Sequence, residues 1–280
     1  MHFGIYLPNF GTECSPRSLA DLASAAEAAG WDGFFLWDHM LASKSQKLPI
    51  VDPWITLAAA ATQTERIRLG TTVTPVARRR PWKLARETAS LDGLSNGRVV
   101  LGVGLGEPAD ADFEFFGESG DGRVRAAKLD EGLDILAGLW SGKPFSYQGT
   151  HYKIPHKVTF LPAPQQKPRI PSWVGGFWPN KPPFRRAARW DGMIPLKQGG
   201  WVQPEDIVEI LEYVRCHRLN LLPLDVAVIG TRNALGNKPA KVEKELGRYQ
   251  VAGVTWWLEA FYMERNSNEA LMKRAREGPG

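Results

Sequence analysis

The apolar residues of this chain fall into two patterns that alternate along its length. Short runs rich in β-branched and aromatic residues are typical of buried strands, and longer stripes with helical spacing are typical of amphipathic helices. The strand-like runs lie at residues 3–7, 33–37 and 67–73, within 96–107, and at 170–174, 192–195, 225–229 and 253–258. The helical stripes lie at 16–29, 53–61, 81–91, 123–140, 184–190, 204–219, 238–249 and 266–276.

The first helical stripe shows how clearly the boundaries are marked. Ser15 can cap the helix, Pro16 fits its first turn, and Gly30 ends it. A strand precedes this helix and another follows it, and such a unit joins two parallel strands.

Eight strands that alternate with helices in 280 residues predict a (β/α)8 TIM-type barrel, read as a single domain over residues 1–280. Residues 109–167 form an insertion after the fourth strand. Within it, residues 109–122 are read as a loop or lid. Residues 144–152 are read as a hairpin that turns at Gln148 and Gly149.

Composition restricts the class of protein. The chain is 43% hydrophobic and 23% charged, as is usual for a globular protein. It has no apolar run long enough to span a membrane, and residues 1–7 do not resemble a signal peptide. Cys14 and Cys216 are far apart and imply no disulfide framework, so we expect a cytoplasmic protein.

The formal net charge is +5, with basic residues gathered at 78–80 and 181–189. Neither cluster accompanies a nucleic-acid recognition motif, so neither nucleic acid nor membrane is an expected partner. Each cluster is either a solvated surface or an anion site for a phosphate-bearing cofactor.

Residues 96–107 combine a turn, a buried apolar run and glycines at positions 102, 104 and 106. A dinucleotide-binding fingerprint is disfavoured, because its sixth position is occupied by Glu107 and Pro108 follows. Two interpretations are left: a glycine-rich strand end without a ligand, or a cofactor that lies against this exit with Glu107 beside it.

Polar residues follow several of the predicted strands. Asp38 and His39 follow the second strand, residues 71–74 end the third, Glu107 follows the fourth, and residues 175–176 end the fifth. The active sites of such barrels lie at the carboxyl ends of the strands, so these residues should meet. His39 and Glu107 can each give a proton to a substrate or take one from it. Alternatively, His39 is a structural histidine and Glu107 is a solvated loop acid.

Other chemistry is not indicated. The sequence has no Gly-x-Ser-x-Gly nucleophile motif and no His-x-x-x-His spacing, so neither a hydrolase nor a metal site is expected. A bound organic cofactor is the simplest source of redox chemistry in such a barrel.

The segments 4–11, 28–39, 67–75, 91–98, 101–107 and 190–192 together resemble the luciferase-like superfamily of flavin monooxygenases and their deazaflavin (F420)-dependent relatives. This resemblance implies a TIM-type barrel that holds the cofactor ring at the strand ends. It also implies a non-proline cis peptide at Thr71–Thr72 or Thr72–Val73. His39 matches the active-site histidine of the family, and Asp38 matches its neighbour close to the ring.

The resemblance also extends to other site residues. Glu107 matches an acid of the deazaflavin-dependent sugar-phosphate dehydrogenases and is a candidate partner of His39. Backbone amides of 174–177 are expected to hold the tail or phosphate, although 177–183 is bulkier than is common and the chain is shorter than typical relatives. The predicted catalytic residues are therefore His39 and Glu107, and the predicted cofactor-binding residues are Asp38, Thr71, Thr72, Val73, Leu105, Gly106, Gly175, Gly176 and Phe177.

The resemblance slightly favours an FMN-dependent monooxygenase that acts on a small organic substrate with dioxygen. The alternative is an F420-dependent enzyme that transfers hydride to or from a small substrate. Basic residues that can bind either cofactor's phosphate or acidic tail are Arg78, Arg79, Arg80, Lys181 and Arg185. A third hypothesis is a barrel protein that binds a cofactor but is not an enzyme. A homodimer is compatible with all three hypotheses.

Overall fold

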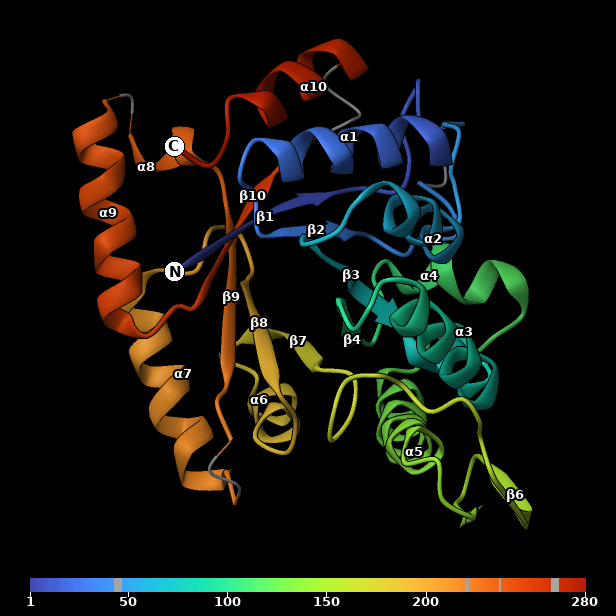
Figure 1. The fold of residues 1–280 in the computed structure, drawn as a ribbon. Helices are drawn as coiled ribbons and strands as arrows, with labels where there is room; N and C mark the ends of the chain where they lie inside the picture. The colour runs from blue at the N-terminus through green and yellow to red at the C-terminus, as the bar shows by residue number, and fades with distance from the viewer. Residues whose placement is uncertain (43–46, 220–221, 237, 263–266) are drawn as a thin grey trace.

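The computed structural model describes residues 1–42, 47–219, 222–236, 238–262 and 267–280. Its main feature is a closed barrel of parallel strands in the order β1-β2-β3-β4-β7-β8-β9-β10 (Figure 1). The strands are β1 (His2–Leu7), β2 (Gly33–Leu36), β3 (Arg68–Pro75), β4 (Val99–Gly104), β7 (Ser172–Trp178), β8 (Gly192–Lys197), β9 (Asp225–Gly230) and β10 (Trp256–Ala260). The predicted (β/α)8 barrel is confirmed.

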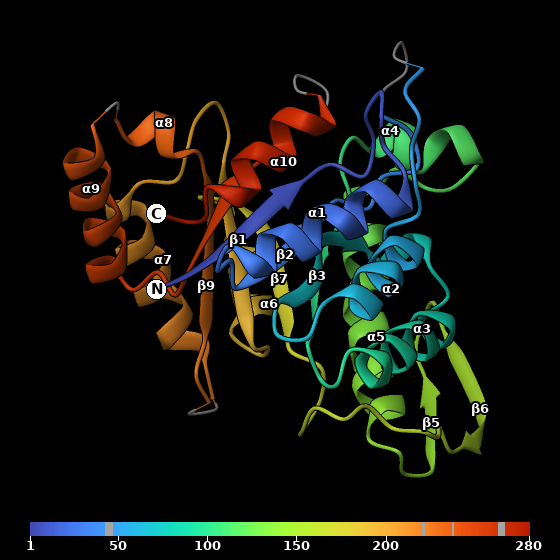
Figure 2. The same ribbon diagram turned by 45° about the horizontal axis from the view of Figure 1, so that its top comes forward.

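Helices connect successive strands and cover the outside of the barrel (Figures 1 and 2). The longer ones are α1 (Pro16–Ala28), α2 (Pro53–Gln63), α3 (Pro81–Leu94), α5 (Gly122–Trp140), α7 (Pro204–His217), α9 (Pro239–Ala252) and α10 (Asn268–Arg276); α6 (Lys181–Ala187) and α8 (Arg232–Leu235) are short. Ser15 caps α1 in a capping box with Ser18, as the sequence predicts for its start. Among the residues that the structure describes, no helix is long and apolar enough to cross a membrane.

Large aromatic side chains fill part of the interior of the barrel. Phe35 lies 5.3 Å from Trp173 and 5.8 Å from Trp256, measured between ring centroids. Glycines on both neighbouring strands make room for Phe35: a Cβ at Gly4 of β1 would lie 2.9 Å from its ring, and one at Gly70 of β3 would lie 3.0 Å from it. Half-buried Tyr6, Val73, Leu196 and Tyr262 pack onto this cluster.

The strand β3 is irregular where it leaves the barrel. Its register with β4 shifts between Thr71 and Thr74, and the peptide bond Thr72–Val73 is cis, at one of the two positions that the resemblance implied. A Cβ at Gly104 would lie 2.6 Å from Val73, so the glycine at the end of β4 accommodates this bulge.

The insertion differs in detail from the prediction. Residues 109–122 are not simply a loop, because they contain the helical turns α4 (Ala109–Asp112) and η2 (Glu114–Phe116). The hairpin of β5 (Phe145–Gln148) and β6 (Lys153–Val158) turns through residues 149–152, later than predicted. The Glu131 carboxylate accepts three backbone N–H groups of that turn, a constraint from α5 that local sequence does not reveal.

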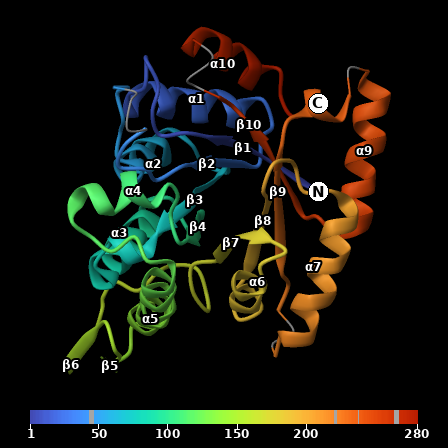
Figure 3. The same ribbon diagram turned by 180° about the vertical axis from the view of Figure 1, so that it is seen from behind.

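Some predicted boundaries also move by several residues. β7 begins at Ser172 and continues to Trp178, beyond the predicted end at 174. α10 begins at Asn268, and position 266 of the predicted helix lies outside the described residues. From behind, both chain ends lie on the side of β9 and α9, and the hairpin projects from the opposite side (Figure 3).

Candidate functional site

The carboxyl ends of the parallel strands form one rim of the barrel, and the predicted site residues follow four of them. Asp38 and His39 follow β2, the bulge 71–74 belongs to β3, Glu107 follows β4, and Gly175 lies in β7. The pairings β2–β3, β3–β4 and β4–β7 make these strands neighbours. The structure therefore brings the four exits to one sector of the rim.

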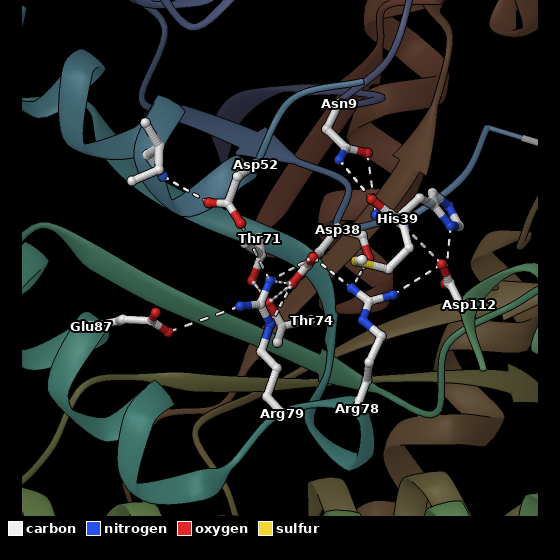
Figure 4. Close-up of polar contacts among 12 residues, drawn as sticks. Asn9, Asp38, His39, Asp52, Thr71, Thr74, Arg78, Arg79, Glu87 and Asp112 are labelled. Carbon is white, nitrogen blue, oxygen red and sulfur yellow. Dashed lines mark hydrogen bonds and ion pairs between the residues drawn. The ribbon is translucent and has the colours of Figure 1, made fainter. Parts of the chain in front are cut away.

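Asp38 is the centre of a buried ion-pair cluster (Figure 4). Arg78 Nη2 donates to its Oδ1 at 2.7 Å, and Arg79 Nη2 lies 2.8 Å from both carboxylate oxygens. The Thr74 hydroxyl lies 2.9 Å from Oδ2. Burial by itself would lower the pKa of the Arg79 guanidinium group, but Asp38, with smaller contributions from Asp52 and Glu87, more than offsets burial and raises it.

This cluster corrects one prediction from the sequence. Arg78 and Arg79 were candidates for binding a cofactor's phosphate or acidic tail. Their guanidinium groups instead neutralise carboxylates of the chain itself. A buried carboxylate needs such partners because its desolvation is costly.

His39 is held at the rim through both its backbone and its ring. Asn9 donates from Nδ2 to the carbonyl of His39 at 3.0 Å and accepts the His39 N–H at 3.2 Å. The imidazole Nδ1 lies 3.2 Å from Asp112 Oδ2. The ring therefore has a defined orientation. The sequence predicted the location of His39 at the rim but not this orientation.

Asp112 is a site residue that the sequence analysis missed. It ends α4, its side chain is fully buried, and its Oδ1 accepts the Met40 N–H at 2.9 Å and pairs with Arg78 Nη1 at 3.0 Å. Figure 4 shows it facing His39 and Arg78. Seventy-three residues separate His39 from Asp112, so no local spacing signals their contact.

The exit of β4 is tied to α5 and not to His39. Arg125 Nη1 donates to the carbonyls of Leu105 and Gly106, and its Nη2 lies 3.3 Å from Glu107. The Glu107 side chain is 61% exposed. The structure thus places Asp112, rather than Glu107, as the carboxylate partner of His39.

The three threonines of the β3 bulge have different environments. Thr71 donates to the Gly102 carbonyl at 3.1 Å, and Thr74 connects Thr71 to Asp38. Among the described residues, the buried hydroxyl of Thr72 has no hydrogen-bond partner. A buried group of this kind is available to a bound polar molecule.

The end of β7 offers backbone groups to the mouth. Its pairing with β4 ends at Val174, whereas its pairing with β8 continues to Trp178. The segment Gly175, Gly176 and Phe177 is therefore bordered by β8 on one side only. Trp178, at the end of β7, is buried against Phe184, with Lys181 Nζ 3.7 Å from its ring centroid.

Aromatic side chains line the mouth beside His39. Trp37 is half-buried, and its ring lies 5.4 Å from both Tyr6 and His39. Burial raises the pKa of the Tyr6 phenol, and Tyr262 adds to this effect. Tyr6 therefore presents a neutral hydroxyl among apolar surfaces.

These features fit a planar redox heterocycle. The bulge offers the Thr72 hydroxyl, the half-buried rings offer flat apolar surfaces, and β7 offers backbone amides for an anionic tail.

Two clefts, of about 860 Å³ beside the chain ends and about 540 Å³ at the opposite end of the barrel, do not border His39. The site is thus defined by the strand ends and their chemistry.

Comparison with known proteins gives the family. A family model described as luciferase-like monooxygenase matches residues 1–277. An F420-dependent glucose-6-phosphate dehydrogenase of Microbacterium testaceum is 35% identical over 167 residues, which cover 59% of this chain and 48% of that protein. The chain thus spans about half the length of the curated dehydrogenases it matches. An uncharacterized protein of Mycobacterium bovis is 31% identical over 91% of this chain and 90% of its own length.

Solved structures share the fold at lower identity. An F420-dependent secondary alcohol dehydrogenase, solved with an F420-acetone adduct, has a TM-score of 0.79 at 17% identity and covers 99% of this chain and 98% of its own. Monooxygenase RslO1 from Streptomyces bottropensis has a TM-score of 0.78 at 22% identity, covering 99% and 97%. With the family match over nearly its whole length, this chain belongs to the luciferase-like monooxygenase family.

Proposed function

We propose that this protein is an oxidoreductase that uses F420 and transfers hydride to or from a small alcohol or carbonyl substrate. The observation that carries the proposal is the His39 imidazole, held by Asp112 at the rim beside the β3 bulge. The names of the curated relatives and of one structural neighbour support F420 as the cofactor.

The proposed roles follow from the chemistry of the reaction. Oxidation of an alcohol releases a hydride from carbon, which bound F420 would accept, and a proton from oxygen. His39 takes that proton in this direction and returns it in the other. Thr72 and Val73 support the ring, Gly175, Gly176 and Phe177 contact the tail, and Trp37 and Tyr6 exclude water from the substrate side.

Two predicted site residues have a different part in this proposal. Asp38 acts through its ion pairs with Arg78 and Arg79 rather than by direct contact with the cofactor. Arg78 also donates to the Asp38 carbonyl and so fixes the backbone next to His39. Glu107, with Leu105 and Gly106, shapes the exit of β4 through Arg125 and is not assigned a proton-transfer role.

An FMN-dependent monooxygenase, which the sequence slightly favoured, is the second candidate. Arg78 and Arg79 no longer support binding of either cofactor's phosphate, whereas exposed Arg80, Lys181 and Arg185 still can. A small-molecule substrate, a cytoplasmic location and a homodimer stay predictions under both candidates.

A cofactor titration followed by a turnover assay tests the proposal. Purified protein would be titrated with F420 and with FMN, then incubated anaerobically with F420 and a panel of secondary alcohols and sugar phosphates. We expect F420 to bind and its absorbance to fall with at least one substrate. Tight binding of FMN alone, with oxygen consumption, would favour the second candidate. Binding without turnover in every assay would favour the non-catalytic barrel.

A further inference from the structure

We infer that Asp112 is a positioning residue for His39: it fixes the proton of the neutral imidazole on Nδ1 and leaves the Nε2 lone pair for the substrate. The catalytic consequence rests on the proposed function, but the orientation of the ring does not. Neither the family resemblance nor the comparisons assign a role to this aspartate.

The two oxygens of the Asp112 carboxylate have different partners, and this supports the inference. Oδ1 accepts the Met40 N–H at 2.9 Å and pairs with Arg78 at 3.0 Å, whereas Oδ2 lies 3.2 Å from His39 Nδ1. An ionised carboxylate only accepts hydrogen bonds, and a neutral imidazole has one N–H. The contact therefore requires the proton on Nδ1.

An arginine and a backbone N–H hold the Asp112 carboxylate in place. Its side chain is fully buried, and Arg78 bridges it to Asp38. Asp38 and Asp112 face Arg78 and Arg79, so this buried cluster balances its charges without a proton on His39. Asp112 can thus orient the ring whether or not His39 is charged.

The rest of the histidine is also constrained. Asn9 holds its backbone, and the rings of Phe10 and Trp37 lie 6.1 and 5.4 Å from the imidazole centroid. A ring flip would move Nδ1 away from Asp112. This arrangement presents Nε2 with its lone pair free, the form that can take a proton from a substrate hydroxyl.

The tautomer of His39 can be measured without any cofactor. The protein would be labelled with ¹⁵N-histidine, and the ring nitrogens would be observed by NMR at about pH 8, above the ordinary titration range of imidazole. A His39→Gln variant assigns the signals. We expect the Nδ1–H tautomer in the wild-type protein. An Nε2–H tautomer there would overturn the inference, and the tautomer itself is measured on the wild-type protein.

The variants Asp112→Asn and Asp130→Asn form a matched pair. Asp130 also pairs with one arginine, Arg186, but at the interface of α5 and α6. We expect the His39 population to shift toward Nε2–H in Asp112→Asn and to stay unchanged in Asp130→Asn. An Asp112→Asn spectrum identical to that of the wild type would overturn the inference.

Turnover adds a separate readout. In the Asp112→Asn variant kcat should fall on the order of 10²-fold with little change in KM, because the substrate meets the wrong tautomer. Equal kcat values in Asp112→Asn and the wild type would overturn the positioning role. If the wild-type protein turns over no substrate, the proposed function fails, while the NMR result still decides the inference.

Discussion

Arg79 places its Nη2 atom 2.8 Å from each carboxylate oxygen of Asp38. Arg78 binds the same carboxylate and reaches Asp112, which contacts His39. One buried network thus links the exits of β2 and β3 to α4, and it determines how His39 faces the mouth. Changes to this network should affect stability and the site in different ways.

Removing the charge of Asp38 should destabilise the protein strongly. In Asp38→Asn, two buried guanidinium groups lose their shared counter-ion, and breaking a buried pair costs about 3–5 kcal/mol. Urea unfolding would measure the change in the free energy of unfolding. Asp134→Asn is the matched control: Asp134 pairs with Arg189 at the surface, so its loss should cost about 0–1 kcal/mol. Similar small losses in both variants would contradict the network's structural role.

Gly102→Ala should disrupt the barrel beside the bulge. The added Cβ would lie 2.0 Å from the backbone oxygen of Thr71, which cannot move without breaking the pairing of β3 and β4. We expect a loss of more than about 3 kcal/mol. In Gly93→Ala, within α3, the added Cβ would have no atom within 4 Å. This change should stabilise the protein by about 0.5–1 kcal/mol. Thermal unfolding of both proteins would show whether the two changes have opposite signs.

The half-buried Asp225 should make stability depend on pH. Burial raises its pKa, so the folded state binds the proton more tightly than the unfolded state does. Its contribution to stability is therefore present below the ordinary aspartate pKa and is lost as the pH rises through the raised value. Asp225→Asn should thus become more stable relative to the wild type as the pH rises through this window, measured by urea unfolding at several pH values.

Asp121 provides a control of opposite sign. Backbone N–H groups of Val124 and Arg123 lower its pKa at the start of α5. Its contribution is present above the ordinary aspartate pKa and is lost as the pH falls through the lowered value. Asp121→Asn should therefore be less stable than the wild type at neutral pH, with the difference vanishing in acid. Parallel pH profiles for the two variants would refute this assignment.

His39→Ala should lose turnover and keep cofactor binding. General acid–base catalysis contributes about 10²–10⁴-fold, so kcat should fall by that factor if His39 carries the proton. The dissociation constant for F420 should change little, because the bulge and the end of β7 are left intact. Unchanged kcat would remove His39 from the mechanism, whereas loss of binding would make it a ligand contact instead.

The sequence predicts the architecture well because the barrel repeats one local rule. Each buried run, cap and stop occurs within a few neighbouring residues, and these signals fix eight strand–helix units. Ser15 and Gly30 mark the limits of α1 in this way, with Gly30 at φ +89° just after its end. Strand ends and the hairpin turn are less well predicted, because contacts such as those of Glu131 come from distant elements.

The site is predicted only in part for the same reason. His39 could be placed because it follows a recognisable strand exit, and the bulge could be placed, to within one residue of Thr72–Val73, because the family resemblance implied it. The pairing of His39 with Asp112, and of Asp38 with two arginines, depends on three-dimensional proximity that no spacing encodes. The sequence therefore left Arg78 and Arg79 as either a solvated surface or an anion site, although they neutralise the chain's own carboxylates.

The most direct test of the account is a crystal structure of the protein with F420. We predict that the deazaflavin ring lies at the rim between the β3 bulge and the end of β7, with His39 Nε2 facing the substrate side. A ring bound at the opposite end of the barrel, or at the rim but remote from His39, would contradict the account.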